Sequence, residues 1–100
     1  MKKAIQIDGK DNVATVTSDV EAGETVEVLS PEGAVIGRPE ALGPAPFGHK
    51  LALVDFESGD RVVKYGEVIG VASRWIGVGE WLHVHNVESA TVPTSAYRED

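Results

Sequence analysis

The sequence contains no cysteine. This absence excludes a disulfide framework, a thiolate nucleophile and a zinc site built from thiolates. A long apolar run is also missing, which excludes a transmembrane helix. The chain begins with Met1-Lys2-Lys3, but only a few apolar residues follow before Asp8, unlike the core of a signal peptide. These absences are compatible with the cytoplasm, which is the location we expect.

Positive charge is scarce as well. Nine Lys and Arg residues stand against 16 Asp and Glu residues, giving a net charge of -7, and the longest basic run is Lys2-Lys3. Phosphate backbones and anionic lipid surfaces attract clustered basic residues, so neither nucleic acid nor a membrane is an expected partner. An anionic small substrate would need local positive groups, such as Lys50, Lys64, Arg74 or a metal, to outweigh the surrounding field.

Helical periodicity is absent too, since no apolar stripe with a 3.6-residue repeat lasts ten residues. A chain of 100 residues forms one domain with a modest core, too small to enclose a deep pocket of its own. Abundant valine and 11 glycines predict a nearly all-β fold. The predicted strands are 4–7, 12–17, 25–29, 34–36, 50–54, 61–63, 68–72 and 81–87. The turn Ser30-Pro31-Glu32-Gly33 predicts a hairpin over 26–36.

One local pattern, apolar-x-x-Gly-acid-x-apolar, occurs three times. The copies are Val20 to Val26, Phe56 to Val62 and Ile76 to Leu82. Each copy predicts an apolar anchor, a turn that needs Gly, and then entry into a strand. The irregular spacing excludes a solenoid, and chance recurrence in a β-rich chain is the alternative interpretation. The Pro-rich segment 43–48 predicts a loop leading to His49. The Ser/Thr/Pro-rich segment 88–100 predicts a tail, either frayed or a docking arm.

The densest chemistry lies in the stretch Gly79 to Asn86. Strand alternation over 81–87 predicts Trp81, His83 and His85 on one face, with the apolar Leu82 and Val84 pointing inward. Two imidazoles on one surface suit a metal, a carboxylate or a proton transfer. The plain alternative is two exposed or partner-packed histidines without a ligand role.

Three further residues carry candidate chemistry. His49 could be a third metal ligand or a general base, or else a loop histidine bonded to the backbone. Lys64 could hold a substrate carboxylate, and Tyr65 could donate a hydrogen bond or form a wall of the site. The alternative for Lys64 and Tyr65 is a solvated turn with a packed tyrosine.

Four segments occur in one order with short gaps: Asp11-Asn12-Val13-Ala14, Gly48 to Leu53, Val63 to Gly70, and Gly79 to Asn86. From about Ile5 to Val87 this series closely resembles the N-terminal SAF-type domain, or separate small subunit, of the altronate/galactarate dehydratase family. The resemblance implies an all-β, SAF-like β-clip fold over 1–87, followed by the tail 88–100. It also implies a large dehydratase-like catalytic subunit as partner, without which this hydro-lyase subunit would be inactive.

The resemblance further implies a metal-dependent elimination from a sugar-acid or 2-hydroxy-acid substrate. The implied catalytic residues are His49, His83 and His85. His83 and His85 are the implied ligands of a divalent metal, Fe²⁺ or Mn²⁺. Binding of this metal could depend on the presence of the large subunit. The implied substrate-binding residues are Lys50, Lys64, Tyr65 and Asn86.

Other functions stay open at this point. A closely similar chain occurs as the alpha subunit of sulfolactate sulfo-lyase, which eliminates sulfite instead of water. A non-catalytic SAF-type module that binds ligands or partners is a second alternative, and an orphan metal carrier is a third. The sequence does not determine the substrate, the metal or the oligomeric state. A homo-oligomer formed through a flat β surface is one option.

Overall fold

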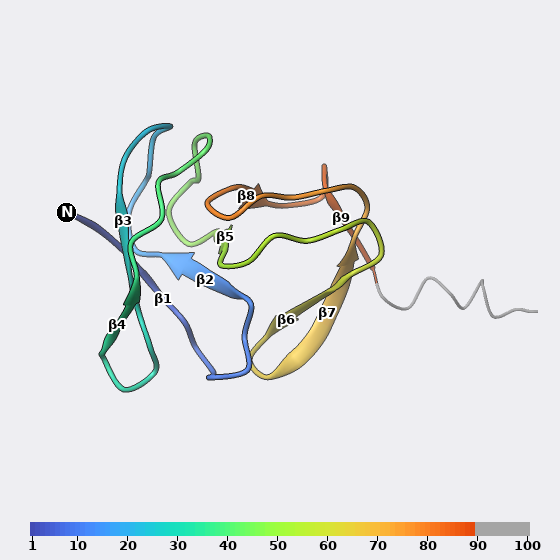
Figure 1. Cartoon of the computed structure of the whole chain (residues 1–100), viewed down its shortest axis with the longest axis horizontal. Helices are drawn as coiled ribbons and strands as arrows, with labels where there is room; N and C mark the ends of the chain where they lie inside the picture. Colours follow the sequence, from blue (N-terminus) through green and yellow to red (C-terminus); the bar gives the residue numbers. More distant parts are fainter. Residues whose placement is uncertain (90–100) are drawn as a thin grey trace, which may run out of the picture.

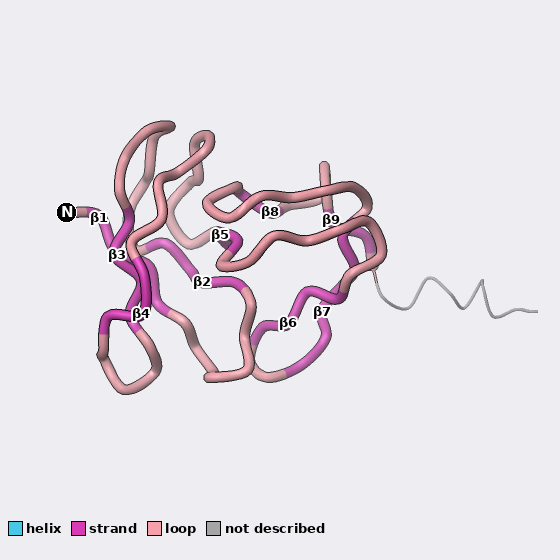
Figure 2. The backbone as a smooth tube through the Cα atoms, in the orientation of Figure 1, coloured by secondary structure: helices cyan, strands magenta, loops and turns pink. Residues whose placement is uncertain are grey.

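The computed structural model describes residues 1–89, and over that range it consists of strands, turns and loops (Figures 1 and 2). The all-β class predicted from the sequence is therefore confirmed. No helix in this range has the length and hydrophobicity needed to cross a membrane. The predicted tail lies outside the described residues from position 90 onward. The strands are β1 (Lys2–Ile5), β2 (Val13–Val16), β3 (Val26–Leu29), β4 (Val35–Gly37), β5 (Lys50–Ala52), β6 (Arg61–Lys64), β7 (Glu67–Ala72), β8 (Trp81–Leu82) and β9 (Val87–Glu88).

The strands form two sheets. One sheet has the order β4-β3-β1-β2-β5-β8, and the other has the order β6-β7-β9. Strands β1 and β3 pair in parallel, whereas the other described pairs are antiparallel. The hairpin predicted over 26–36 is confirmed as the β3–β4 pair. Figure 1 shows β1, β3 and β4 at one end of the molecule and β6, β7 and β9 at the other.

Two apolar clusters fill the interior. The first lies on the six-stranded sheet and includes Val16, Val26, Val28 and Leu51. The second joins both sheets and consists of Val13, Ala52, Phe56, Val62, Ala72, Ile76 and Leu82. Full burial of one such large apolar side chain contributes about 1.5–3 kcal/mol. Burial of Leu51 and Leu82 therefore fixes how β5 and β8 face the core.

The strand predicted over 81–87 is wrong beyond Leu82. Residues 83–86 form a turn, in which the N–H groups of Asn86 and Val87 donate to the His83 carbonyl at 3.0 and 2.9 Å. Val84, predicted to point inward, is 81% exposed.

The cause of this turn is the side chain of Asn86, which is fully buried. Its Oδ1 accepts the His83 N–H at 2.9 Å, and its Nδ2 donates to the Trp81 carbonyl at 2.9 Å. A side-chain amide that satisfies nearby backbone groups in this way competes with strand pairing. The chain therefore turns after β8 and re-enters a sheet only at β9.

The thrice-repeated sequence pattern adopts one conformation, which we call the capped turn. In each copy the glycine has a positive φ: +89° at Gly23, +94° at Gly59 and +90° at Gly79. The acidic side chain then accepts the backbone N–H of the residue three positions earlier. The donor–acceptor distances are 2.8 Å for Glu24, 2.8 Å for Asp60 and 3.1 Å for Glu80. The repetition is thus structural, because the acid satisfies a backbone donor that the turn would leave unpaired.

Candidate functional site

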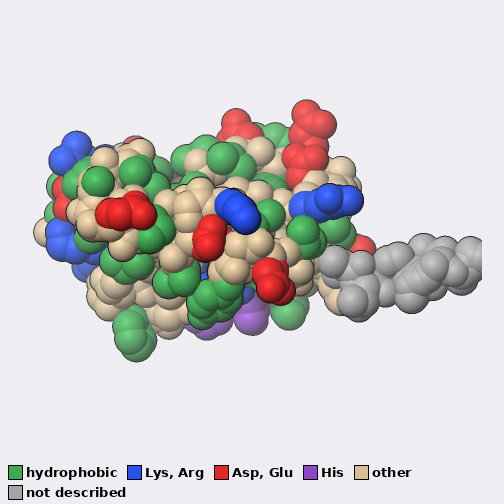
Figure 3. All heavy atoms as spheres, turned by 90° about the horizontal axis from the view of Figure 1, so that it is seen from below, with side chains coloured by type: hydrophobic (Ala, Val, Ile, Leu, Met, Phe, Trp, Pro, Cys, Tyr) green, Lys and Arg blue, Asp and Glu red, His purple; other side chains and the backbone are tan. Residues whose placement is uncertain are grey.

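All three histidines of the chain gather around Trp81. The ring centroids of His49, His83 and His85 lie 5.6, 5.5 and 5.1 Å from the Trp81 ring. His83 is stacked on the indole with an interplanar angle of 11°, and its ring also lies 5.0 Å from that of His49. Figure 3 shows histidine side chains grouped at one edge of the molecule, with hydrophobic side chains beside them. We call these four residues the Trp81 cluster.

Sheet register and the turn after β8 bring the cluster together. Strands β5 and β8 pair with Leu51 opposite Trp81 and Lys50 opposite Leu82. Directly opposed residues of antiparallel strands share a face, so the Trp81 indole lies on the same face as Leu51. There it packs, partly buried, against the first apolar cluster, next to the residue that precedes β5. The turn after Leu82 then returns His83 and His85 to the same indole. Strand alternation also predicts both histidines beside Trp81, but the turn, and not alternation, places them there.

A hydrogen bond fixes the chemical form of His49. The indole Nε1–H of Trp81 donates to Nδ1 of His49 at 3.1 Å. Nδ1 must carry a lone pair to accept this bond, so the ring is neutral and its proton resides on Nε2. The half-buried His49 ring can therefore offer a hydrogen-bond donor, while its Nδ1 is occupied.

His49 itself lies in a fourth turn of the repeated type. The segment Ala45 to Leu51 reads apolar-x-x-Gly-His-x-apolar, and Gly48 has a φ of +83°. The N–H of His49 donates to the Pro46 carbonyl at 3.0 Å, as Glu80 donates to Gly77 at 3.0 Å in a capped turn. In this fourth turn, however, a histidine takes the place of the acid. Pro46 takes the place of the residue whose N–H would be capped, and proline has no N–H.

The equivalence of the four turns is visible in how they pair. The apolar anchors form two isolated bridges, Val20 with Ala45 and Phe56 with Ile76. The aspartate before the first anchor of each pair accepts a backbone N–H from the opposite turn, Asp19 from Phe47 at 2.8 Å and Asp55 from Val78 at 3.0 Å. The position of His49 thus corresponds to that of Glu80. The repeated sequence pattern, with its acid after the glycine, does not include this turn, although the spacing of Ala45, Gly48 and Leu51 carries the signal.

Positive charge lies beside the cluster. A groove of about 290 Å³ is lined by Lys50, Ile69, His83, Val84, Val87 and Glu88, among others. Burial lowers the pKa of the Lys50 ammonium, and the positive charge of Lys64 lowers it further. On the other side, Trp81 and His85 line a second hollow of about 350 Å³ together with Leu42 and Glu80. The cluster therefore borders two hollows, one of which contains a cation that an anionic ligand would stabilise.

The remaining predicted site residues lie elsewhere. Tyr65 occupies the turn between β6 and β7 with a φ of +59°, and the Lys64 ammonium lies 4.9 Å from the centre of its ring. This turn is at the end of β7 away from Ala72, where β7 pairs with Val87 of β9. Lys64 therefore acts on Lys50 through its charge, whereas Tyr65 lies apart from the Trp81 cluster. Asn86 lies in the interior, where its amide holds the turn after β8.

The described residues 1–89 do not by themselves form a metal site. Over residues 1–89, no group of three or more His, Cys, Asp or Glu side chains is placed to hold a metal ion. Within the cluster, Nδ1 of His49 is already bonded to the indole. His83 and His85 as metal ligands therefore stay a prediction, in which further donors would come from outside residues 1–89.

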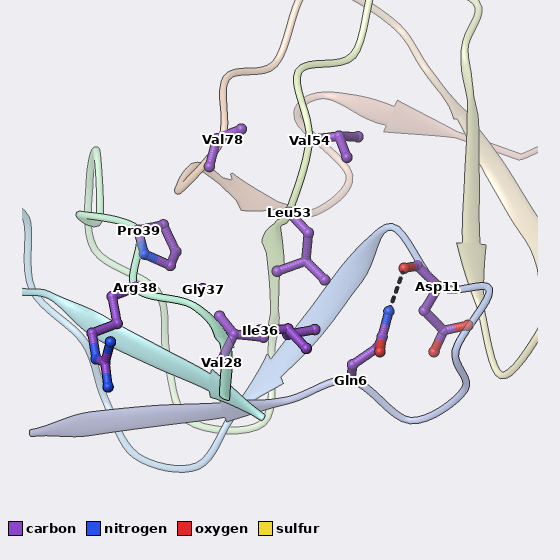
Figure 4. Close-up of a pocket in the computed structure, with 10 residues that line it drawn as sticks. All are labelled: Gln6, Asp11, Val28, Ile36, Gly37, Arg38, Pro39, Leu53, Val54 and Val78. Atoms are coloured by element: carbon purple, nitrogen blue, oxygen red, sulfur yellow. Dashed lines mark hydrogen bonds between the residues drawn. The ribbon is translucent and has the colours of Figure 1, made fainter. Parts of the chain in front are cut away.

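A separate hollow of about 520 Å³, shown in Figure 4, offers shape without reactive groups. Much of its wall is apolar, with Ile36, Leu53 and Val54 among the lining residues. Gln6 lines it as well, but its Nε2 donates to the Asp11 carbonyl at 2.9 Å (Figure 4). The Asp11 carboxylate is also engaged, since it accepts three backbone N–H groups, from Asp8, Tyr65 and Gly66. We therefore take the Trp81 cluster, and not this hollow, as the candidate site.

Comparison with known proteins places this geometry in context. The family model described as the altronate/galactarate dehydratase SAF domain matches residues 2–90. Altronate dehydratase of Bacillus subtilis is 38% identical over 89 residues, which cover 89% of this chain and 17% of that protein. Galactarate dehydratase (L-threo-forming) of Escherichia coli is 36% identical over 78% of this chain and 14% of its own length. The alpha subunit of (2R)-sulfolactate sulfo-lyase from Paracoccus pantotrophus is 40% identical over 52% of this chain and 78% of its own. The chain thus spans about a sixth of the length of the two dehydratases.

Proposed function

Since the chain belongs to the altronate/galactarate dehydratase SAF-domain family, we propose that it is the small component of a sugar-acid hydro-lyase. The Trp81 cluster would lie at the edge of an active site that a larger dehydratase-like chain completes. The observation that carries this proposal is the gathering of all three imidazoles around one indole, beside the half-buried Lys50. The small share of the relatives' length that the chain covers supports the need for a larger catalytic part.

The reaction requires two proton movements. A base removes the proton α to the substrate carboxylate, the C–H electrons form the new double bond, and the β C–O bond breaks. An acid supplies a proton to the departing hydroxide, which leaves as water. Negative charge grows on the carboxylate as the enediolate develops, so fixed positive groups and hydrogen-bond donors lower the barrier.

The residues of the chain fit these tasks in part. Lys50, aided by the charge of Lys64, would hold the substrate carboxylate, because an anion beside Lys50 offsets the burial and, to a lesser degree, the repulsion from Lys64 that lower its pKa. His83 and His85 are the candidates for proton transfer, or for ligands of an ion that the larger chain helps to bind. The remaining acid–base groups would come from the larger chain.

The test is reconstitution. The chain is co-purified with a large dehydratase-like chain encoded beside it, and turnover of altronate, galactarate and sulfolactate is measured. The complex should turn over a sugar acid, and either chain alone should not. His85→Ala should abolish most of the turnover. Trp75→Phe is the matched control, since Trp75 is 56% exposed and is not part of the cluster. Full turnover together with full metal content in the His85→Ala complex would refute the site.

Sulfolactate sulfo-lyase is the second candidate. It is favoured by the matched segment, which covers 78% of the Paracoccus alpha subunit. Here the bond that breaks is C–S, and sulfite departs with the electron pair. Sulfolactate turnover without sugar-acid turnover would select this reading. Turnover of neither substrate, combined with stable ligand or partner binding, would select a non-catalytic SAF-type module.

A further inference from the structure

We propose that Trp81 is a positioning residue for His49, and that the Ala45 to Leu51 turn, which has the geometry of a capped turn but no acid, presents His49 as a functional imidazole. His49 would serve as a neutral hydrogen-bond donor through Nε2. The geometric part of this inference depends on the chain alone. The catalytic part rests on the proposed function.

The first support comes from the comparison of the four turns. In the three capped turns the acidic side chain is engaged by a backbone N–H, as Glu80 is by Gly77 at 3.1 Å. In the fourth turn that donor is absent, because the equivalent residue is Pro46. The side chain at position 49 therefore has no capping task. The turn still forms, since Gly48 keeps the positive φ and His49 N keeps its bond to the Pro46 carbonyl.

The second support is the set of contacts made by Trp81. Its indole N–H is directed to His49 Nδ1 at 3.1 Å, while its ring contacts both other histidines. The indole is itself held by β8, whose pairing with β5 is fixed by the buried Leu51 and Leu82. A rigid donor of this kind sets both the orientation of the imidazole and the nitrogen that carries its proton.

The consequence is a specific role for His49. A base needs an open lone pair, and that of Nδ1 is occupied. A neutral Nε2–H can instead donate to the carboxylate oxygen that gains charge as the enediolate forms. In this role no bond to His49 breaks and its proton stays on Nε2, so the proton balance of the elimination is unchanged. Neutral imidazole acting as an electrophile has precedent in isomerases that form enediolates.

The geometric part is tested by nitrogen-15 NMR spectroscopy of the isolated chain at neutral pH. His49 should show an unprotonated Nδ1 and a protonated Nε2. The Trp81 indole N–H should exchange with solvent at least tenfold more slowly than that of the exposed Trp75, an order of magnitude typical of a protected hydrogen bond. In Trp81→Phe, which keeps an aromatic ring but removes the donor, His49 should populate both tautomers. Equal exchange of the two indoles, or a proton on Nδ1, would overturn the proposal.

The catalytic part is tested in the reconstituted enzyme. Trp81→Phe should lower kcat roughly tenfold, about the loss of one aligned hydrogen bond in the transition state, with a KM change of less than about twofold. Trp75→Phe should leave both constants unchanged. Full kcat in the Trp81→Phe enzyme would overturn the positioning role. A parent complex that turns over no substrate would refute the proposed function instead, while the NMR result would still decide the geometry.

Discussion

Replacement of Gly79 by alanine tests how tightly the turn before Trp81 is fixed. The matched control is Gly23→Ala, because both glycines hold the same position of a capped turn, with φ of +90° and +89°. A Cβ at Gly79 would lie 2.2 Å from the carbonyl oxygen of Glu40, whereas a Cβ at Gly23 would meet no atom within 4 Å. The pair of variants therefore separates backbone strain from steric overlap.

The expected magnitudes follow from these surroundings. The positive φ costs about 1–2 kcal/mol for an alanine at either position. Loss of unfolded-state entropy returns about 0.4–1 kcal/mol in both variants. Gly79→Ala must also displace backbone that is held on both sides, since Gly79 N donates to the Ala52 carbonyl and Gly79 O accepts from Leu42 N. That displacement adds about 1–3 kcal/mol. Gly23→Ala should thus destabilise by about 1 kcal/mol, and Gly79→Ala by about 2–4 kcal/mol.

Urea denaturation followed by tryptophan fluorescence measures both values, with linear extrapolation and a check that the m-value is unchanged. Equal destabilisation of the two variants, within about 0.5 kcal/mol, would refute the steric argument and with it the close packing of the turn against Glu40.

Three further predictions address the site. The double variant Pro46→Ala/His49→Glu rebuilds a capped turn, so its free energy of unfolding should exceed that of Pro46→Ala/His49→Ala by about 1 kcal/mol in urea denaturation, while turnover of the complex is lost. Retained turnover would remove His49 from the active site. Lys50→Met should stabilise the chain relative to the parent near neutral pH, because the folded state disfavours the charged amine. Since the folded-state pKa of Lys50 is lowered from 10.5, the unfolded parent binds more protons in the window below that value, and the parent's stability should rise with pH there. The difference in stability between Lys50→Met and the parent should then narrow as the pH rises toward 10.5, and a constant difference would contradict the burial of Lys50. Asn86→Ala should cost about 2–4 kcal/mol, since it leaves the His83 N–H and the Trp81 carbonyl without their partner. Near-UV circular dichroism should report the altered Trp81, and an unchanged spectrum at full stability would contradict the role of Asn86 in the turn.

Local features of the fold could be predicted because neighbours in the sequence determine them. The valine-rich segments gave the all-β class. Pro31 and Gly33 predicted the β3–β4 hairpin, and the Gly-acid pattern predicted turns, though not the capping of a backbone N–H by the acid, because each of these signals acts within a few residues. The family also follows from the sequence, since its motifs are contiguous. The positions of the strand ends were predicted less accurately, because the pairing partner of a strand, and not its residue propensities, decides where the ladder of backbone hydrogen bonds ends.

The arrangement of the site depended on contacts that no local pattern contains. Alternation predicted a strand through Val87, but burial of the Asn86 amide turned the chain after Leu82. The bond between Trp81 and His49 joins residues 32 positions apart and exists only through the register of β5 and β8. The sequence by itself therefore determined which side chains could do chemistry. Long-range pairing and the burial of one polar side chain decided which of them meet and, at His49, which nitrogen holds the proton.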